Sequence, residues 1–424
     1  MIDLKLLRDD PGSVRTAYAR RGGVPQLEEV IELDREHRRL LADVERVRAE
    51  HNRASRAIAL AAPSDRPAAI AEAKDLAERL KELEPELEGT EAELVRLASY
   101  LPNLPHESVP PGLSEQDNVV EREVGDKPRF DFAPVDHATL GQRLGIFDAE
   151  RGAKTSGSRF VYLTGPGVVL ELSLVRFAVD VLADRGFTPV ITPVLVRERA
   201  MYGTGFLPAE EREIYRVERD ELFLTGTSEV ALAALHADEI LDAGKLPLRY
   251  AGFSTNFRRE AGTYGRETQG LVRLHQFDKV EQFSLSHPDE SWDEYASILR
   301  NQEELLQALE IPYRVLVMCA GDLGPMAAKK VDHEAWLPAS DRFMEVTSAT
   351  HATDYQARRL QIRLREGGKS RLVHTLNGTA FAIGRTIVAL LENHQRADGG
   401  VIIPKPLRRY TGFDHLDPIA QKGS

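Results

Sequence analysis

Cysteine is almost absent from this sequence, with a single residue, Cys319, among 424. One thiol cannot form an internal disulfide or supply a multi-thiolate zinc site, so we expect no structural zinc. Cys319 ends the apolar run 313–319, which favours a buried and unreactive thiol. A reducing, cytoplasmic environment agrees with this usage.

Long apolar runs are absent too. No stretch approaches the roughly 18 apolar residues that a membrane-spanning helix needs, so the sequence predicts no membrane partner. The first ten residues carry charges through their apolar pattern and are not expected to act as a secretion signal. A length of 424 residues predicts two or three domains.

Net positive charge is likewise lacking, since 55 basic residues stand against 67 acidic ones, a formal charge of −12. This balance argues against a protein that coats nucleic acid without specificity. It does not exclude a specific RNA partner, because such a partner depends on local basic surface.

The N-terminal part carries a heptad pattern in two segments. A polar break at 62–67 with two prolines separates them, which predicts an antiparallel coiled-coil hairpin over about 26–101. At about 1.5 Å per residue, arms of roughly 35 residues extend some 50 Å. Pro85 is expected to kink the second helix. The first seam is Val30, Leu33, His37, Leu40, Val44, Val47, His51, Ala54 and Ile58, and the second is Ala69, Ala73, Leu76, Leu80, Leu83, Leu87, Thr90, Leu94, Leu97 and Leu101.

The two predicted arm helices differ in charge. The second is rich in glutamate, whereas the first carries arginines off its apolar seam, which either follow RNA phosphates or pair with neighbouring glutamates in solvent. The pattern alone favours the solvated, ion-paired face. These arginines are Arg35, Arg38, Arg39, Arg46, Arg48, Arg53 and Arg56.

The composition changes after the hairpin. Proline-rich residues 102–119 predict a linker between an N-terminal domain, 1–101, and a second domain, 120–424. In the second domain, segments with strand character at 189–196, 249–259, 273–286 and 371–376 outnumber simple alternating strand–helix units. We therefore predict an α+β fold, an antiparallel sheet flanked by helices, in place of a doubly wound parallel sheet.

Glycine-rich phosphate cradles are also missing, since neither G-x-G-x-x-G nor G-x-x-x-x-G-K-[ST] occurs at a strand–helix junction. A nucleotide would therefore be bound by side chains. The segment 257–281 offers arginines at 258, 259, 266 and 273. Strand alternation predicts that Arg273, His275, Phe277, Lys279 and Glu281 share one face. Such a face suits phosphate, a flat base and an ammonium or hydroxyl group, although a charged surface hairpin explains the residues equally well.

At this point the sequence resembles the class II aminoacyl-tRNA synthetases and, within them, the seryl-tRNA synthetase family, over nearly its whole length. Three segments resemble the class motifs: 170–193 with Pro193 (motif 1), 257–281 (motif 2) and 376–386 (motif 3). The runs Thr225-Gly-Thr-Ser-Glu229 and Glu345-Val-Thr-Ser348 resemble the family's serine loop and its metal and ATP strand. Weaker matches are 136–141 and 203–205.

The resemblance implies a role for each matching residue. Arg258 would hold the α-phosphate and the serine carboxylate, Arg273 the γ-phosphate, and Phe277 with Arg385 the adenine. The implied catalytic residues are Arg258, Arg385 and Glu345, and the implied Mg²⁺ ligands are Glu345 and Ser348. The implied serine-binding residues are Thr227, Ser228, Glu229, Arg258, Glu281 and Thr379. The implied ATP-binding residues are Arg258, Arg259, Glu260, Arg273, Phe277, Glu345, Val346, Thr347, Ser348 and Arg385.

The resemblance also implies partners. They are ATP as substrate with Mg²⁺, L-serine, tRNA(Ser) bound through the hairpin, with tRNA(Sec) as a further substrate, and a second copy of the chain through motif 1. Two residues depart from the family pattern: His351, where asparagine is common, and Thr379, where serine is common. Both are expected to alter the serine pocket. Two alternatives stay open, a specialised or antibiotic-resistance paralogue and an amino acid:carrier-protein ligase; the latter class lacks the hairpin and uses cysteine-bound zinc.

Overall fold

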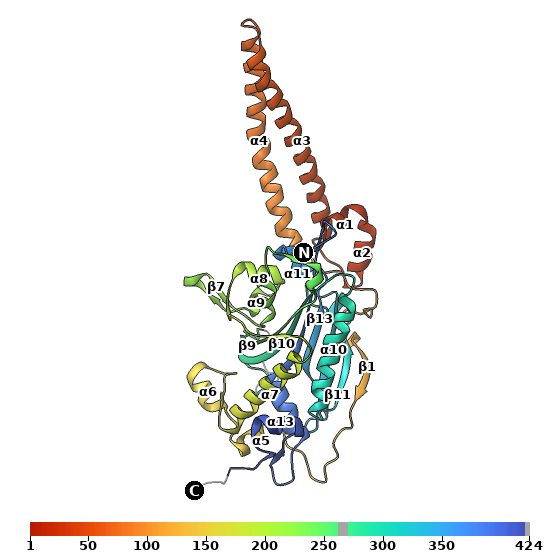
Figure 1. The fold of residues 1–424 in the computed structure, drawn as a ribbon, viewed down its shortest axis with the longest axis vertical. Helices are drawn as coiled ribbons and strands as arrows, with labels where there is room; N and C mark the ends of the chain where they lie inside the picture. The colour runs from red at the N-terminus through yellow and green to blue at the C-terminus, as the bar shows by residue number, and fades with distance from the viewer. Residues whose placement is uncertain (262–269, 420–424) are drawn as a thin grey trace. The chain divides into compact units, whose positions relative to one another are not determined.

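The computed structural model describes residues 1–261 and 270–419. The chain divides into two compact units, the first ending at Pro102 and the second beginning at Asn103. The first unit is helical and is drawn from red to orange in Figure 1. Its helices are α1 (Leu4–Asp9), α2 (Pro11–Ala19), α3 (Leu27–Leu60) and α4 (Arg66–Ala98).

The helices α3 and α4 pack side by side along their length (Figure 1), which confirms the predicted hairpin. Apolar seam residues such as Val30, Leu40 and Val47 are at most 1% exposed because they pack against the facing helix. The predicted break is a turn of five residues, with Pro67 in the first turn of α4. The helix α4 runs through Pro85 as one element.

One buried charged residue of the first unit lies off the predicted seam. Asp34 is 2% exposed and accepts hydrogen bonds from Arg8 at 2.6 Å and from Arg38 at 3.1 Å. Burial opposes ionisation of Asp34, but hydrogen bonds from Arg8 and the charge of both arginines lower its pKa. The pair ties α1 to the base of α3.

The second unit is built on an eight-stranded sheet whose neighbouring strands are antiparallel, except that β4 runs parallel to β9. This confirms the predicted antiparallel α+β architecture. In spatial order the strands are β1 (Val119–Val124), β11 (Tyr313–Val317), β12 (Lys329–Leu337), β13 (Arg342–His351), β16 (His374–Ala382), β10 (Gln276–Ser286), β9 (Leu248–Phe257) and β4 (Thr188–Ile191).

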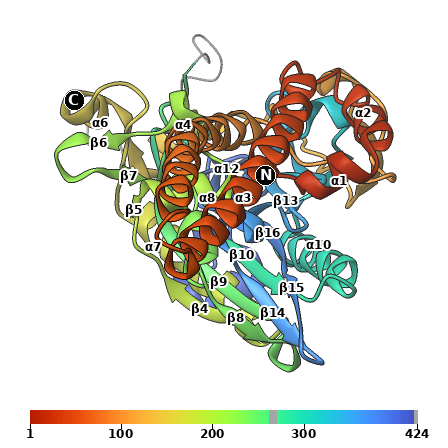
Figure 2. The same ribbon diagram turned by 90° about the horizontal axis from the view of Figure 1, so that it is seen from above.

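Short strands form smaller sheets around this one, and helices flank it (Figures 1 and 2). The small sheets pair β2 (Phe147–Asp148) with β3 (Tyr162–Leu163), join β5 (Leu195–Arg197), β7 (Leu222–Leu224) and β6 (Arg216–Val217), join β15 (Lys369–Leu372), β14 (Arg363–Glu366) and β8 (Ile240–Asp242), and pair β17 (Val401–Ile402) with β18 (His415–Leu416). The helices are α5 (His137–Leu144), α6 (Ala149–Ser156), α7 (Pro166–Ala183), α8 (Glu198–Thr204), α9 (Glu229–Ala234), α10 (Ser291–Ala308), α11 (Tyr355–Leu360), α12 (Ile383–Asn393) and α13 (Lys405–Thr411).

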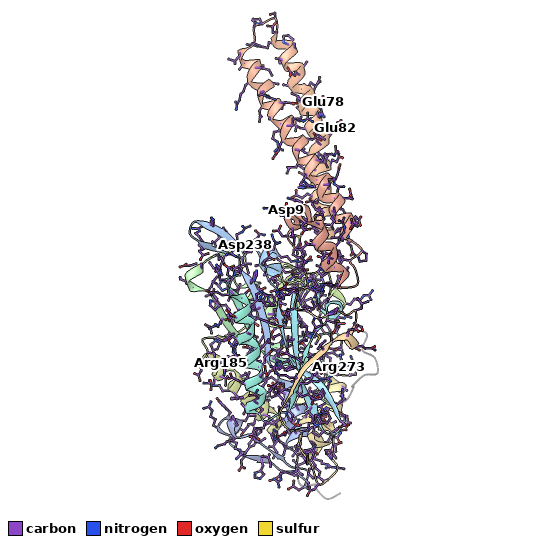
Figure 3. The ribbon with its side chains drawn as sticks, turned by 90° about the vertical axis from the view of Figure 1, so that its right-hand side faces the viewer. Asp9, Glu78, Glu82, Arg185, Asp238 and Arg273 are labelled. Carbon is purple, nitrogen blue, oxygen red and sulfur yellow. The ribbon has the colours of Figure 1, made fainter. Side chains whose placement is uncertain are left out.

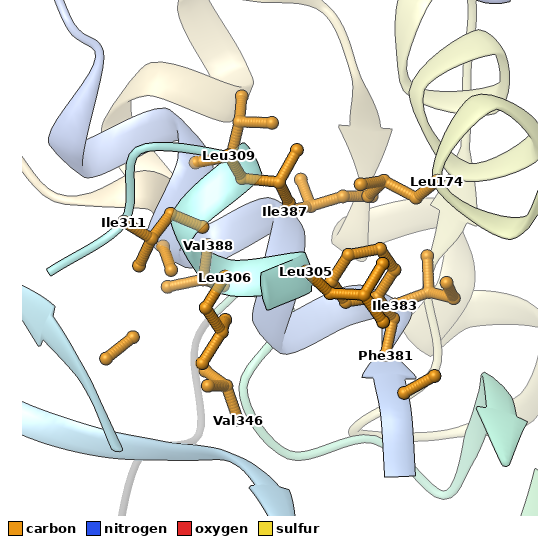
Figure 4. Close-up of a cluster of buried hydrophobic side chains, with 14 of the residues drawn as sticks. Leu174, Leu305, Leu306, Leu309, Ile311, Val346, Phe381, Ile383, Ile387 and Val388 are labelled. Atoms are coloured by element: carbon orange, nitrogen blue, oxygen red, sulfur yellow. The ribbon is translucent and has the colours of Figure 1, made fainter. Parts of the chain in front are cut away.

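The main core lies where α7, α10 and α12 cover one face of the sheet. Leu174, Leu305, Phe381 and Ile387 meet there and are at most 1% exposed (Figure 4). Arg185, which follows α7 and is labelled in Figure 3, pairs with Glu304 of α10. Burying these apolar side chains supplies most of the stability of the unit.

The two faces of β10 have different surroundings. Gln282 and Ser284 face α10, where they hydrogen-bond Asn301 and Glu294. Side chains of opposite parity project from the other face, and there Phe283 packs with α9 and α11. Helices therefore close one face along its length and leave part of the other face open.

The segment predicted as a linker, 102–119, is held in place from Asn103 onward. The side-chain amide of Asn103 donates to the carbonyls of Met326 at 2.9 Å and Ala352 at 2.8 Å. Cys319 is buried as predicted. Its backbone N–H donates to Oδ1 of Asn118 at 2.9 Å, and the N–H of the next residue, Ala320, donates to the carbonyl of Pro110 at 3.0 Å. Within the described ranges, no helix is long and apolar enough to cross a membrane.

Candidate functional site

A cleft of about 500 Å³ opens on the uncovered part of the sheet, entirely within the second unit. Strands β10, β13 and β16 form its floor, and the 225–229 loop and the start of α12 form its sides. Thirteen of the residues that the resemblance singled out line it: Thr227, Glu229, Arg258, Glu260, Arg273, Phe277, Glu281, Glu345, Val346, Thr347, Ser348, Thr379 and Arg385.

An arginine and a carboxylate are paired on one wall of the cleft. Arg385 donates from Nη1 to the side chain and to the backbone carbonyl of Glu345, each at 3.0 Å. Enclosure by the cleft would raise the pKa of Glu345, but the charges of Arg385 and Lys330 outweigh it and lower the pKa to about 2. Glu345 is therefore ionised at neutral pH, and its side chain is 42% exposed toward the cleft.

A second group of cations and an aromatic ring lies at the end of β9 and the start of β10. Arg258 directly follows β9, donates from Nε to the carbonyl of Gly226 at 3.3 Å, and lies over the ring of Phe277 at 5.4 Å. Arg273 pairs with Glu260 at 3.1 Å. Guanidinium groups beside a flat ring provide both phosphate-binding donors and a stacking surface for a base.

The innermost part of the cleft is a small polar network. Lys279 lies 2.7 Å from Glu281 and donates to the hydroxyl of Thr227 at 2.8 Å. Thr379 on the neighbouring strand β16 donates to Glu281 at 3.1 Å. All four residues are less than 8% exposed, so each polar group depends on its neighbours for hydrogen bonds. A site of this size and polarity suits a small ligand that carries an ammonium and a hydroxyl group.

A further carboxylate borders this network. Glu229 begins α9 and is 5% exposed. Burial, with the nearby charge of Glu281, raises the pKa of Glu229 to about 7, although the hydrogen bond from Gln356 at 2.7 Å opposes the shift. Carboxylates whose pKa is raised this far by burial and a like charge are typical of functional sites.

Several predicted residues do not line the cleft. Ser228 is buried and donates to the carbonyl of Gly252 at 3.3 Å, which holds the loop to β9. Arg259 points to the ring of Tyr215 at 5.5 Å. His275 precedes β10 and bonds the carbonyl of Arg258 at 3.0 Å, so strand alternation does not extend to it. Arg266 lies outside the described residues.

His351, expected to alter the serine pocket, lies elsewhere. Its ring is fully buried, stacks on Trp292 at 4.0 Å between centroids, and bonds the hydroxyl of Ser291 at 3.1 Å. Burial lowers the pKa of His351 to about 3. His351 therefore packs β13 against the start of α10 and is absent from the cleft lining.

Other residues of the cleft were not identified from the sequence. Glu210, Lys330 and Asn377 line it, as does Lys279, which strand alternation placed but to which no role was given. Lys330 comes from β12 and lies 3.3 Å from Asp332, a residue whose pKa burial raises to about 6. Asn377 lay inside the recognised motif 3, two residues before Thr379, so strand alternation along 376–386 would have found it.

Comparisons with known proteins agree with this geometry. Residues 1–105 match the family model described as the seryl-tRNA synthetase N-terminal domain, and residues 215–394 match the tRNA synthetase class II core domain (G, H, P, S and T). Serine–tRNA ligases of Acidothermus cellulolyticus and Thermobifida fusca are 49% and 48% identical, covering 99% and 100% of this chain and 100% of each relative.

Solved structures show the same likeness. The seryl-tRNA synthetase of Pyrococcus horikoshii, solved as a complex with ATP, superimposes with a TM-score of 0.94 at 44% identity, covering 99% of this chain and 100% of that one. The cytoplasmic serine–tRNA ligase of Naegleria fowleri, solved with AMP, gives a TM-score of 0.89 at 31% identity and 99% coverage of both chains. With an N-terminal helical hairpin, a class II core and full-length relatives at this identity, the chain belongs to the seryl-tRNA synthetase family of class II aminoacyl-tRNA synthetases.

Proposed function

We propose that this chain is a serine–tRNA ligase, which activates L-serine with ATP to seryl-adenylate and transfers the seryl group to the 3′-terminal adenosine of tRNA(Ser). One observation supports this best: a single cleft combines arginines beside an aromatic ring with a buried network of Lys279, Glu281, Thr227 and Thr379. The first group suits a nucleotide and the second a small amino acid.

The activation step requires no protein nucleophile. An oxygen of the serine carboxylate attacks the α-phosphorus, the bond to the β-phosphate oxygen breaks, and diphosphate leaves with the electron pair. The side chain of Arg258 would orient the carboxylate and the α-phosphate, since a guanidinium binds both by paired hydrogen bonds. Charge that builds up on the phosphorus oxygens would be stabilised by these fixed cations.

The ATP would lie along the arginine-rich wall. Phe277 and Arg385 would enclose the adenine, and Arg273, with Glu260 close by, would bind the γ-phosphate. The ionised Glu345 and the hydroxyl of Ser348 fit Mg²⁺, a hard cation that binds few protein oxygens together with phosphates. Bound there, the ion would neutralise phosphate charge.

The serine would occupy the inner network. The carboxylates of Glu229 and Glu281 would receive its ammonium and hydroxyl hydrogens, while Thr379 narrows the space around the hydroxyl. A pocket built to hydrogen-bond a hydroxyl rejects an analogue without one by roughly 10⁴–10⁵. Alanine would leave these buried groups without a partner, and threonine would have to fit its extra methyl beside Thr379.

The helical unit would bind tRNA in the second step, in which the 3′-hydroxyl of the terminal adenosine attacks the seryl carbonyl and AMP leaves. Five of the seven arginines noted on α3 pair with carboxylates, whereas Arg53 and Arg56 are exposed and have no ion-pair partner within the described residues. The pairing agrees with the solvated-face interpretation for most of α3 and leaves cations for phosphates near its distal end.

A second copy of the chain would bind at the motif 1 surface. Exposed apolar side chains gather on α7 and on the edge strand β4, where Leu172 is 60% and Ile191 is 82% exposed. An edge strand beside an apolar patch is a surface that association would cover. We also propose a cytoplasmic location, as expected for translation enzymes of this family, and tRNA(Sec) as a second substrate of the same arm.

The test is ATP–diphosphate exchange with a panel of amino acids, followed by charging of total tRNA. Serine should support exchange, with alanine and threonine weaker by orders of magnitude. If serine supports no exchange, the proposal is wrong. A variant in which 26–101 is replaced by a short linker should keep exchange within about threefold and lose charging by roughly 100-fold or more, since phosphate contacts dominate RNA affinity. An equal loss of both steps would contradict tRNA binding by the arm.

A further inference from the structure

Gln356 lies behind the cleft and is not part of its lining. It is the second residue of α11, is fully buried, and brings its side-chain amide to Glu229. Its Nε2 lies 2.7 Å from Glu229 Oε1 and 3.2 Å from the backbone carbonyl of Thr204, with Met326 Sδ at 3.4 Å.

These contacts leave one orientation for the amide. Thr204 is the last residue of α8, so its carbonyl has no partner within its own helix and accepts from Gln356 instead. If the amide were turned over, its oxygen would face both that carbonyl and the carboxylate of Glu229. In the observed orientation the buried Oε1 has no donor within the described part of the chain, a cost that the two bonds from Nε2 offset.

We propose that Gln356 is a positioning residue for serine recognition, which favours the ionised form of Glu229 and fixes the direction in which its carboxylate faces the cleft. An amide N–H held in this orientation can only donate, so it favours the charged form of Glu229. The proposal rests on the proposed function, because it assigns the serine ammonium to Glu229.

The surroundings of Glu229 explain why it needs a donor. Glu281 on β10 and Glu210 in the segment after α8 place negative charge nearby, and Lys279 on β10 is the facing cation. Burial and Glu281 raise the pKa of Glu229 to about 7 even with the hydrogen bond from Gln356. Without that donor the pKa rises further, and at neutral pH the carboxyl group would be mostly protonated and would not attract an ammonium.

The experiment compares Gln356→Leu with the wild type in serine-dependent exchange between about pH 6 and 8.5. In the variant, the KM for serine should rise roughly tenfold at pH 7 and approach the wild-type value at the alkaline end, because Glu229 ionises there. The KM for ATP and kcat should change by less than about threefold. Gln356→Met, which keeps the length of the side chain, should show the same changes in the KM for serine as Gln356→Leu.

Gln395→Leu is the matched control. Gln395 is also buried and donates to two carbonyls, those of Val135 at 3.1 Å and Glu392 at 2.9 Å, without contact to a cleft residue. A rise in KM that is independent of pH, or equal in the control, would show a merely structural role and overturn the proposal. An unchanged KM for serine in Gln356→Leu would also overturn the proposal.

The wild-type profile is the reference for both variants. Its KM for serine should rise as pH falls below about 7, where Glu229 takes up a proton, and in the variants this rise should begin at a higher pH; superimposable profiles of wild type and variants would overturn the inference. Absence of exchange with serine at any pH would instead refute the proposed function, so the two failures are distinguishable.

Discussion

The helical unit and the cleft use the same ion-pair chemistry in opposite surroundings. On the arm, the side chains of Arg39 and Glu36 are 59% and 42% exposed, whereas in the cleft those of Lys279 and Glu281 are 8% and 2% exposed. Water screens the first pair, so such a pair contributes about 0.2–1 kcal/mol. Removing one partner of the second leaves a buried charge, which costs about 3–5 kcal/mol. Arm charges should therefore tolerate replacement one at a time, and cleft charges should not.

The largest expected effect separates two neighbouring arginines. Arg258→Ala should lower kcat/KM for serine-dependent exchange by about 10³-fold or more, because in the proposed function it removes the cation that would orient the reacting phosphate. Arg259→Ala should lower it by less than about fivefold, since Arg259 points to Tyr215 and away from the cleft. Steady-state ATP–diphosphate exchange measures the loss of activity in both variants, and thermal melting shows whether each variant is still folded. Equal losses would mean that ATP reaches Arg259, as the resemblance implied.

A smaller effect separates two threonines of β16. Thr379→Val removes the donor to Glu281, and should lower kcat/KM for serine by about 10- to 100-fold and narrow the preference for serine over alanine. Thr375→Val is the control, because the hydroxyl of Thr375 is buried without a hydrogen-bond partner in the described structure. The measurement is ATP–diphosphate exchange of both variants with serine and with alanine. If the control lost as much activity, disturbance of the strand would be the cause.

Patterns within one element were readable from the sequence. Heptad spacing gave the seam of α3 and α4 because burial follows the helical repeat along the chain. Alternation placed Phe277, Lys279 and Glu281 on the cleft side of β10 for a similar reason. It was wrong for His275, since β10 begins only at Gln276. Arg273 also precedes β10 and yet lines the cleft, so outside a regular strand alternation does not decide which way a side chain points.

Contacts between distant elements could not be found in this way. Asp34 is buried against Arg8, which comes from another helix. Gln356, which donates a hydrogen bond to Glu229, lies 127 residues away from it along the chain. The resemblance named Ser228 and Arg259, yet one holds the loop to β9 and the other stacks on Tyr215. A motif gives the residue types near a site, while the fold decides which of them point into it.

The smallest expected effect is on the arm, where Arg48 of α3 and Glu84 of α4 lie 2.7 Å apart and are 56% and 43% exposed. A double-mutant cycle with Arg48→Ala and Glu84→Ala, measured by urea unfolding, should give a coupling below about 0.5 kcal/mol that disappears in high salt. Asp34→Ala, which removes the buried partner of Arg8 and Arg38, should cost about 3 kcal/mol in the same unit. Exchange with serine should be unchanged in all of these variants. A coupling of several kcal/mol between Arg48 and Glu84 would break the comparison, since it would mean that water does not screen the charges of the arm.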